Sequence, residues 1–352
     1  MSDRPKPEFT CPTPLPSKGT ILLGHGSGGK LTADLIREIF LPAFQNPILA
    51  RLDDQAIMSV DGVRLAFTTD SFVVQPLFFP GGDIGSLAVH GTINDLAMGG
   101  AQPLCLSAAF IIEEGLPMET LSQVVNSLHH AAESAGVQVV TGDTKVVEKG
   151  SGDGLFINTS GLGVVPEGLC LSADQARPGD GVILSGSIGE HGIAVMAVRE
   201  GLEFESSVAS DSAALHGLVA AMVAATPTGI RCMRDPTRGG VSSALNEIAA
   251  QSRVGMLLDE KTILVREEVK GACELLGLDP LYVANEGKLV AIVAPEVIED
   301  VLAAMRSHPL GERADLIGTV TEAHPGVVAM RTLIGTTRIV DMLAGDQLPR
   351  IC

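Results

Sequence analysis

Residues 235–251 read Asp235-Pro-Thr-Arg-Gly-Gly-Val-Ser-Ser-Ala-Leu-Asn-Glu-Ile-Ala-Ala-Gln251, a polar turn followed by a helix-like run. Apolar residues recur at helical spacing, which predicts a helix over residues 239–251. The positive end of its dipole and its free backbone N–H groups would attract phosphate. Asp and Gly are also ordinary turn and cap residues, so the motif alone fits a plain helix start equally well.

Strand-like and helix-like patterns alternate on both sides of this stretch, which predicts an α/β (α+β) fold. In the first half, we expect strands at residues 63–69, 137–141 and 155–165, and helices at residues 84–98 and 118–135. In the second half, we expect helices near residues 194–200, 211–225, 239–251 and 295–307, and strands at residues 182–185, 288–293, 315–321 and 326–331.

Turn chemistry after residue 165, in Pro-Glu-Gly and then Arg-Pro-Gly-Asp, places a domain boundary near residue 168. Prolines at five positions prevent regular structure near the N-terminus. After Arg338 the apolar pattern fades, which is typical of a mobile tail. The predicted organisation is an extended arm, two domains and a tail that ends in a cysteine, over residues 1–19, 20–168, 169–338 and 339–352.

The formal net charge of −18 repels nucleic-acid phosphates and anionic lipid headgroups. No run approaches the roughly 20 apolar residues that span a bilayer, and the N-terminus lacks the apolar stretch of a signal peptide. We therefore expect a cytoplasmic protein that binds proteins and small molecules, and neither nucleic acid nor membrane. The six cysteines show none of the zinc-site spacings.

A glycine-rich loop, Ile21-Leu-Leu-Gly-His-Gly-Ser-Gly-Gly-Lys30, is similar to a phosphate-binding loop. Glycines let backbone N–H groups approach an anion, and Lys30 adds positive charge. Leu31 stands where a P-loop carries the hydroxyl that binds Mg²⁺, so a true P-loop is disfavoured. A flexible loop before a helix stays an alternative.

Carboxylates follow at Asp54, Asp70 and Asp95, each at an expected element end or beside a small residue. Such side chains hold Mg²⁺ together with nucleotide phosphates, although a single Asp in a turn is more often a cap. Two further polar motifs accompany apolar strands: Gly142-Asp-Thr-Lys145 follows one, and Asn285-Glu-Gly-Lys288 precedes another.

Taken together and in this order, Asp-Asp-x-Ala, Thr-Thr-Asp, Asn-Asp-Leu-Ala, Gly-Asp-Thr-Lys and Asp-Pro-Thr-Arg-Gly-Gly resemble the AIR-synthase-like ATP-binding superfamily. Within it, His25-Gly-Ser-Gly-Gly-Lys30, Ala284-Asn-Glu-Gly-Lys288 and the closing Pro349-Arg-Ile-Cys352 resemble the HypE family of hydrogenase maturation factors. The resemblance runs from about residue 20 to the end. It implies N-terminal domains that dimerise into a shared β-barrel, and ATP bound in a cleft beside that interface.

The resemblance also implies the functional residues. Mg²⁺ and ATP would be bound by four carboxylates, those of Asp54, Asp70, Asp95 and Asp235. The reacting group would be carried by Cys352 and faced by Lys145 and Glu286. The other expected ATP-binding residues are Gly26, Ser27, Gly28, Gly29, Lys30, Asn94, Asp143, Thr144, Thr237 and Arg238.

The implied activity is ATP-dependent dehydration of an S-carbamoyl group on Cys352 to an S-cyano group, which supplies the cyanide ligand of the iron in NiFe hydrogenases. Phosphorylation turns the amide oxygen into a good leaving group. Glu286 would be the base and Lys145 its charge partner, although these two roles could be exchanged. The implied partners are the carbamoyltransferase HypF as donor, the HypC–HypD complex as cyanide acceptor, and a second copy of the chain.

Three alternatives stay open. A selenophosphate synthetase shares the aspartates and the glycine loop, but it places a reactive Cys or Sec in or beside that loop, and residues 25–30 contain neither. An AIR-synthase-type ligase has no need of a terminal cysteine. A non-catalytic scaffold would dock hydrogenase-assembly proteins through its tail.

Overall fold

The computed structural model describes residues 19–201 and 208–345. The first half forms a five-stranded sheet in the order β1-β2-β7-β5-β6. Strands β5 and β6 pair in parallel, and the other neighbours pair antiparallel. The strands are β1 (Ala56–Val60), β2 (Val63–Phe72), β5 (Gln102–Glu113), β6 (Gln138–Val147) and β7 (Leu155–Val164), and a small hairpin of β3 (Phe78–Phe79) and β4 (Gly82–Asp83) follows β2.

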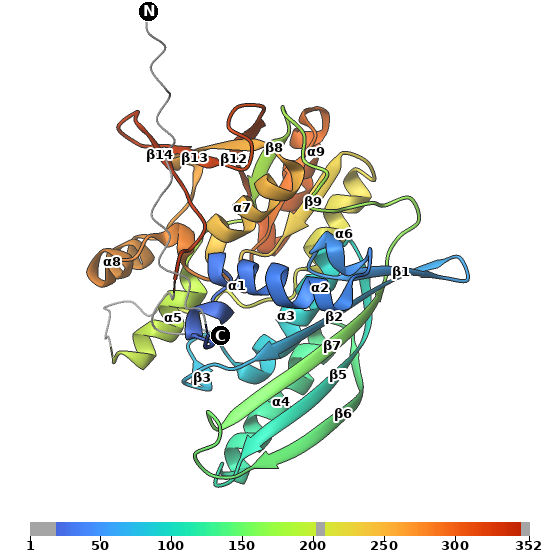
Figure 1. Ribbon diagram of the computed structural model, residues 1–352, viewed down its shortest axis with the longest axis vertical. Coiled ribbons are helices and arrows are strands. Elements are labelled where there is room, and N and C mark those ends of the chain that lie inside the picture. Colours follow the sequence, from blue (N-terminus) through green and yellow to red (C-terminus); the bar gives the residue numbers. More distant parts are fainter. Residues whose placement is uncertain (1–18, 202–207, 346–352) are drawn as a thin grey trace, which may run out of the picture.

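Helices α3 (Ile84–Met98) and α4 (Met118–Ser134) cover one face of this sheet (Figure 1). The residues of β7 alternate between buried and half-buried, which is the pattern of a strand with one covered face. Helix α3 is buried along almost its whole length, because the sheet, α4 and the second half of the chain all pack against it.

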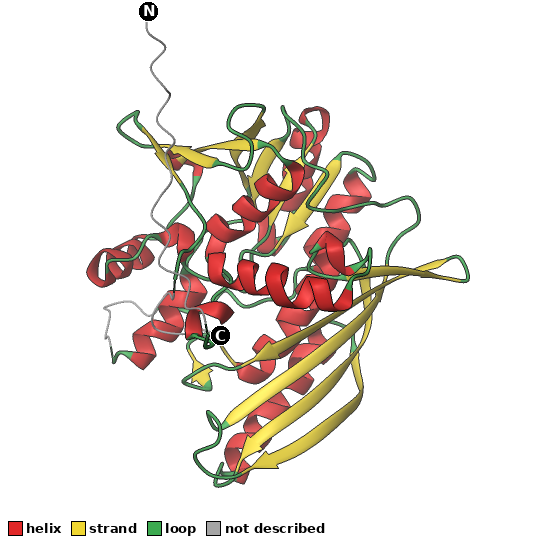
Figure 2. Cartoon of the chain, in the orientation of Figure 1, coloured by secondary structure: helices red, strands yellow, loops and turns green. Residues whose placement is uncertain are grey.

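The second half forms a seven-stranded sheet in the order β14-β13-β10-β12-β8-β11-β9, with helices on both faces (Figure 2). Helix α7 packs on one face, and α6 and α9 pack on the other. The strands are β8 (Gly181–Leu184), β9 (Ile230–Arg234), β10 (Gly255–Asp259), β11 (Val290–Val293), β12 (Asp315–Thr321), β13 (Val328–Arg331) and β14 (Thr337–Ile339). The helices are α5 (Glu190–Arg199), α6 (His216–Ala225), α7 (Gly240–Ser252), α8 (Glu267–Leu276) and α9 (Ile298–Arg306).

Two apolar clusters join the two halves. The C-terminal turn of α3 buries Leu96 and Met98 in the same cluster as Leu218 of α6 and Ala291 of β11. These shared clusters set the first sheet and α3 against the second half, where several of the polar motifs lie. Short helices α1 (Lys30–Leu35) and α2 (Leu41–Phe44) run across the outside of this junction (Figure 1).

Most of the predicted helices and strands are confirmed. Three predicted positions differ from the structure, each for a physical reason. Strand β6 continues through the Gly-Asp-Thr-Lys motif, because it pairs with β5 up to Val147, so the motif lies within the strand and not after it. Asp70 likewise lies inside β2, where it pairs with Thr159. Helix α6 begins at His216 and not near residue 211, because Asp211 is bonded to the backbone of another loop.

In the part of the chain that the structure describes, no helix combines the length and the apolar character needed to cross a membrane. The five-stranded sheet is open, with β1 and β6 at its edges. The boundary expected near residue 168 falls between β7 and β8 and stays a prediction.

Candidate active site

Four aspartates converge where the first sheet meets the second half. Asp54 precedes β1, Asp70 lies on β2, Asp95 on α3, and Asp235 directly follows β9. Burial, together with the negative charges of the other aspartates, raises their pKa values: that of Asp54 to about 6, that of Asp235 to about 8 and that of Asp95 well above its usual range. The negative charges of the other three carboxylates each raise the pKa of Asp95, because the four groups lie close enough to repel one another.

Other side chains of the protein contact two of these carboxylates, those of Asp54 and Asp95. Arg234 lies 2.8 Å from Asp54 and also 2.7 Å from Glu247, and the hydroxyl of Thr68 donates to Asp95 at 2.7 Å. Over residues 19–201 and 208–345, no three His, Cys, Asp or Glu side chains are arranged as ligands of one metal. The cluster suits a cation that takes part of its coordination from phosphate oxygens, as Mg²⁺ commonly does with nucleotides.

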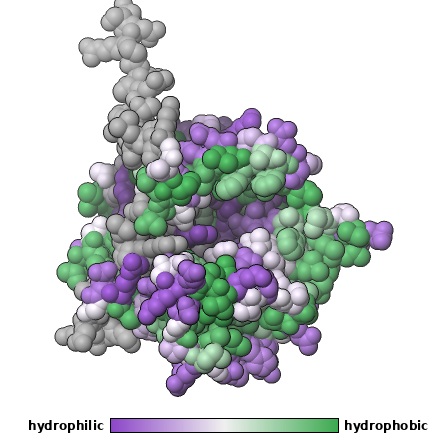
Figure 3. Space-filling view, turned by 60° about the horizontal axis from the view of Figure 1, so that its bottom comes forward, coloured by the Kyte–Doolittle hydropathy of each residue, from purple (hydrophilic) through white to green (hydrophobic). Residues whose placement is uncertain are grey.

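A cleft of about 970 Å³ is lined by Ser71, which follows Asp70, and by Arg238, three residues after Asp235; the four aspartates themselves are not among the described residues that line it. The glycine loop, β6 and the Asp-Pro-Thr-Arg-Gly-Gly turn all contribute to its walls, through Ser27, Lys145 and Arg238 among others. Arg238 also lowers the pKa of Asp70, against the larger effect of burial, so Asp70 lies near the wall of the cleft that Arg238 lines. Figure 3 shows a face of the molecule with a hydrophilic hollow bordered by apolar side chains. The cleft is large enough for a nucleotide.

The glycine loop is packed tightly enough to explain its composition. Gly28 has φ +73°, and a Cβ there would lie 2.6 Å from the carbonyl oxygen of Arg238. A Cβ at Gly29 would lie 2.2 Å from the carbonyl oxygen of Leu343. Arg238 in turn donates to the carbonyl of Gly26 at 3.2 Å. The loop therefore lies against both the turn of residues 235–240 and the C-terminal segment.

The described part of the predicted tail, residues 339–345, is held beside this loop. The ammonium of Lys30 lies 2.6 Å from Asp341, and its backbone N–H donates to Leu343 at 2.8 Å. The hydroxyl of Ser27 donates to the carbonyl of Gly345 at 3.2 Å. Lys30, expected to face phosphate, is thus paired with a carboxylate of the tail. Cys352 lies outside the described residues.

The two residues expected to face the reacting group have different surroundings. Lys145 lies on the exposed strand β6, lines the cleft and pairs with Asp143 at 3.7 Å. Glu286 is 4% exposed and follows two residues after Ala284, which lines the cleft. The charge partner that the structure places nearest Lys145 is therefore Asp143, whereas the sequence predicted Glu286.

Three other residues expected to bind ATP have surroundings of different kinds. The amide of Asn94 is fully buried and contacts the backbone of residues 213, 215 and 286, so its polar atoms do not face the cleft. Thr237 closes the turn after Asp235 through its backbone. Thr144 lies on exposed β6, opposite Phe110 of β5. Sequence patterns missed Arg234 and Glu247, although Arg234 directly precedes Asp235.

Comparison with known proteins identifies the family of the chain. Models of the AIR synthase related protein match residues 52–165 with the N-terminal domain and residues 177–330 with the C-terminal domain. The chain is 60% identical to the carbamoyl dehydratase HypE of Rhizobium leguminosarum bv. viciae, over 96% of both chains. It is 59% identical to that of Azotobacter vinelandii, over 95% of this chain and 98% of the relative.

Solved structures give the same result. The structure of HypE in complex with ATP superposes with a TM-score of 0.79 at 49% identity, over 95% of this chain and 100% of that one. The structure of a HypE–HypF complex superposes with a TM-score of 0.83 at 50% identity, over 88% and 99%. The chain therefore belongs to the AIR synthase related family and, within it, to the carbamoyl dehydratase HypE family.

Proposed function

We propose that this chain uses ATP to dehydrate a carbamoyl group on its own Cys352 to a cyano group, as the cyanide-forming step of hydrogenase maturation. The path of the C-terminal segment carries this proposal. Gly345 contacts Ser27 on the wall of the cleft. Only seven residues, 346–352, extend from there to the terminal thiol, a reach of at most about 25 Å. The test is whether ATP removes the mass of one water from a carbamoylated C-terminal peptide.

The reaction has a balanced course. The carbamoyl oxygen attacks the γ-phosphorus of ATP, ADP departs, and a proton leaves the nitrogen, which gives an S-bound O-phosphorylated imidate. The second N–H proton then leaves, the C–O bond breaks, phosphate departs, and the C≡N triple bond forms. We propose Glu286 as the acceptor of an N–H proton and Lys145 as the cation that steadies the phosphorylated oxygen.

The buried aspartates would hold the Mg²⁺ that accompanies ATP. They fit a divalent cation because their charges repel one another in a buried site, which a cation relieves. Mg²⁺ neutralises charge during phosphoryl transfer, and the chain's own contribution is to place the nucleotide and the thiol. Asp95→Asn or Asp235→Asn should keep the fold and weaken binding of Mg·ATP.

The raised pKa of Asp235 predicts a pH-dependent stability difference. Its pKa is about 8 in the folded chain and about 4 in an unfolded one. The unfolded chain therefore loses this proton first, so ionisation destabilises the metal-free fold progressively from about pH 4 to pH 8. Asp235→Asn avoids this loss. Its melting temperature without metal should exceed that of the unaltered chain by a margin that grows with pH.

The difference between the two proteins reports on Asp235 and on the aspartates whose pKa values its charge raises, such as Asp95, since the buried histidines titrate alike in both. Mg²⁺ should raise the melting temperature of the unaltered chain at pH 8 more than that of Asp235→Asn, because the cation binds the ionised cluster. A margin that shrinks from pH 5 to pH 8 would contradict the account.

The contact between Lys30 and Asp341 predicts a gain in affinity. The phosphates of ATP must compete with Asp341 for Lys30, and half-exposed pairs of this kind contribute about 0.2–1 kcal/mol. Asp341→Asn should therefore tighten ATP binding by up to about fivefold in calorimetric titration. Asp315→Asn breaks a similarly exposed pair with Arg306 and serves as the control. Weaker ATP binding by Asp341→Asn would exclude the competition.

We further propose that the chain forms a homodimer through the five-stranded sheet. Strand β6 is an edge strand and exposes Val139, Val140 and Val146, and the uncovered face adds Phe67 of β2. Exposed apolar edges of this kind normally pair with a partner. Val140→Asp should shift the chain toward monomer in sedimentation experiments, whereas Leu275→Asp, on exposed α8, should not. An unchanged dimer, or a monomeric unaltered chain, would refute this interface.

The solved complex of a relative with HypF supports HypF as the carbamoyl donor. We propose the HypC–HypD complex as the acceptor of the cyano group and the cytoplasm as the compartment, as the sequence predicted.

A further inference from the structure

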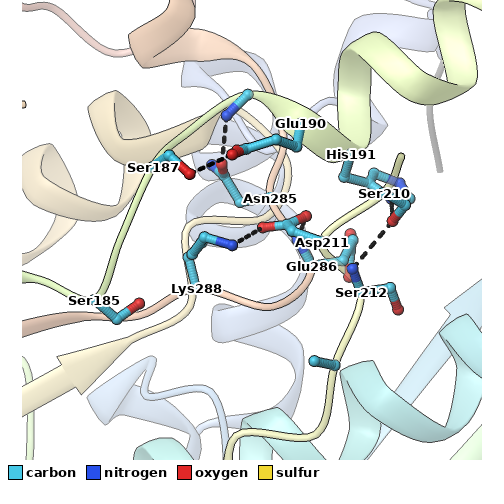
Figure 4. Close-up of polar contacts among 12 residues, drawn as sticks. Ser185, Ser187, Glu190, His191, Ser210, Asp211, Ser212, Asn285, Glu286 and Lys288 are labelled. Atoms are coloured by element: carbon cyan, nitrogen blue, oxygen red, sulfur yellow. Dashed lines mark hydrogen bonds and ion pairs between the residues drawn. The ribbon is translucent and has the colours of Figure 1, made fainter. Parts of the chain in front are cut away.

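The peptide of Glu286 is held by two segments, the loop of residues 211–213 and helix α3. Figure 4 shows Asp211 of that loop beside Glu286. The backbone N–H of Glu286 donates to the carboxylate of Asp211 at 3.1 Å. Its carbonyl accepts from the side chain of Asn94 at 3.1 Å and from the N–H of Ala213 at 3.4 Å. With both backbone groups engaged, the direction in which its side chain leaves the backbone is set by the surrounding protein.

Asp211 also forms a buried ion pair with Lys288. The ammonium of Lys288 lies 3.1 Å from its carboxylate, and the two side chains are only 14% and 4% exposed (Figure 4). A buried ion pair is weak evidence for stability, since both charges lose their hydration. Gly287, between Glu286 and Lys288, touches the same residue: a Cβ there would lie 1.8 Å from the carbonyl oxygen of Asp211.

The residues beside Asp211 are anchored as firmly. Ser210 bonds to His191 of α5 at 2.8 Å, and Ser212 bonds to His90 of α3 at 2.9 Å. Burial lowers the pKa of both histidines to about 4, so they are neutral at the pH of the reaction. Asp211 therefore cannot move without breaking contacts to both halves of the chain.

We propose that Asp211, held by Lys288, is a positioning residue that fixes Glu286 in the orientation needed for proton removal. This inference rests on the proposed role of Glu286 as the base. The carboxylate of Asp211 locks the peptide of Glu286, and Lys288 compensates the negative charge that Asp211 brings beside that base. Asp211 thus sets the orientation of Glu286, and Lys288 balances the charge of Asp211. Separate substitutions can test the two effects.

The first test separates geometry from charge in the purified full chain, carbamoylated on Cys352. Asp211→Ala removes the acceptor of the Glu286 N–H, and the dehydration rate at saturating Mg·ATP should fall about 100-fold, the scale of a misplacement near 1 Å. Asp211→Asn keeps an acceptor oxygen and should retain the rate within about threefold. ATP affinity should stay unchanged in both variants.

The second test uses the pH profile of dehydration. Lys288→Met leaves the charge of Asp211 uncompensated beside Glu286, so the acidic limb should move to higher pH. Asp211→Asn leaves Lys288 without its partner, so the limb should move to lower pH. The other titratable groups facing this loop, His90, His191 and Glu190, are the same in all variants. If the pair had only a structural role, Lys288→Met and Asp211→Asn would lower the stability of the fold but would not move the acidic limb of the pH profile in opposite directions.

Asp180→Asn is the matched control. Asp180 is also buried, accepts a backbone N–H from Arg177 at 2.8 Å and pairs with Arg231 at 3.5 Å, and neither of these contacts involves Glu286. It should lower the melting temperature comparably without changing the dehydration rate.

Equal rates in Asp211→Ala and Asp180→Asn would overturn the proposal. If Asp211→Ala does not fold, unmoved acidic limbs in Asp211→Asn and Lys288→Met would overturn it. A normal dehydration rate in Glu286→Gln would show that Glu286 is not the base, and the positioning role of Asp211 would then fall as well. If Glu286→Gln loses activity while Asp211→Ala dehydrates at the normal rate, only the positioning role would be refuted.

Discussion

A chain in which Cys352 is replaced by alanine is expected to bind ATP as tightly as the unaltered chain, melt at the same temperature and acquire neither a carbamoyl nor a cyano group. The terminal thiol is the proposed nucleophile, and no cysteine is among the described residues that line the cleft. Buried Cys232 and Cys273 are poor substitutes, because burial raises the pKa of each thiol above its usual value. The loss of product should be complete, as judged by mass spectrometry of the C-terminal peptide.

Cys170 provides the control for this substitution. It is the exposed cysteine among those in the described residues, so it tests whether any accessible thiol suffices. Cys170→Ala should be carbamoylated and dehydrated normally. Full modification of Cys352→Ala at another cysteine would show that the terminal thiol is not the carrier.

Glu286→Gln is expected to give the second largest loss. Glutamine keeps the shape of the side chain but cannot accept a proton, so carbamoylation and ATP binding should persist while dehydration slows about 10²- to 10⁴-fold. The carbamoylated chain should therefore accumulate. Single-turnover measurement of cyano product after addition of Mg·ATP reports this step directly.

Glu190→Gln is a suitable comparison, because Glu190 is also 4% exposed and bonds to Ser187 outside the cleft lining. It should affect stability and leave the dehydration rate within a few-fold. Equal rates in the two variants would assign proton removal to another group, with Lys145 the next candidate.

Local patterns sufficed for much of the fold. Helix α3 begins at Ile84 and ends at Met98 as predicted, since an apolar run of this length between glycine-containing turns has few other structures available. Strand β5 was not predicted, and it carries Pro103 near its start, a residue that weakens a strand. The proline lies where the pairing register of β5 with β7 shifts, between Pro103 and Cys105.

The site was predictable where its residues belong to motifs and not where they depend on distant contacts. The four aspartates follow from their motifs. The pairing of Lys30 with Asp341 joins residues 311 positions apart, and that of Arg234 with Asp54 joins residues 180 apart. Asp211 lies in no motif at all, and its contact with Glu286 joins residues 75 positions apart within the second half of the chain.

The central claim is tested most directly by following the mass of one peptide. The full chain is incubated with its HypF partner and a carbamoyl donor, Mg·ATP is then supplied to the isolated product, and the C-terminal peptide is analysed at each stage. We predict a gain of one carbamoyl group at Cys352, followed by a loss of one water only when Mg·ATP is present. A carbamoyl group on Cys11, Cys105, Cys170, Cys232 or Cys273, or water loss without ATP, would contradict the account.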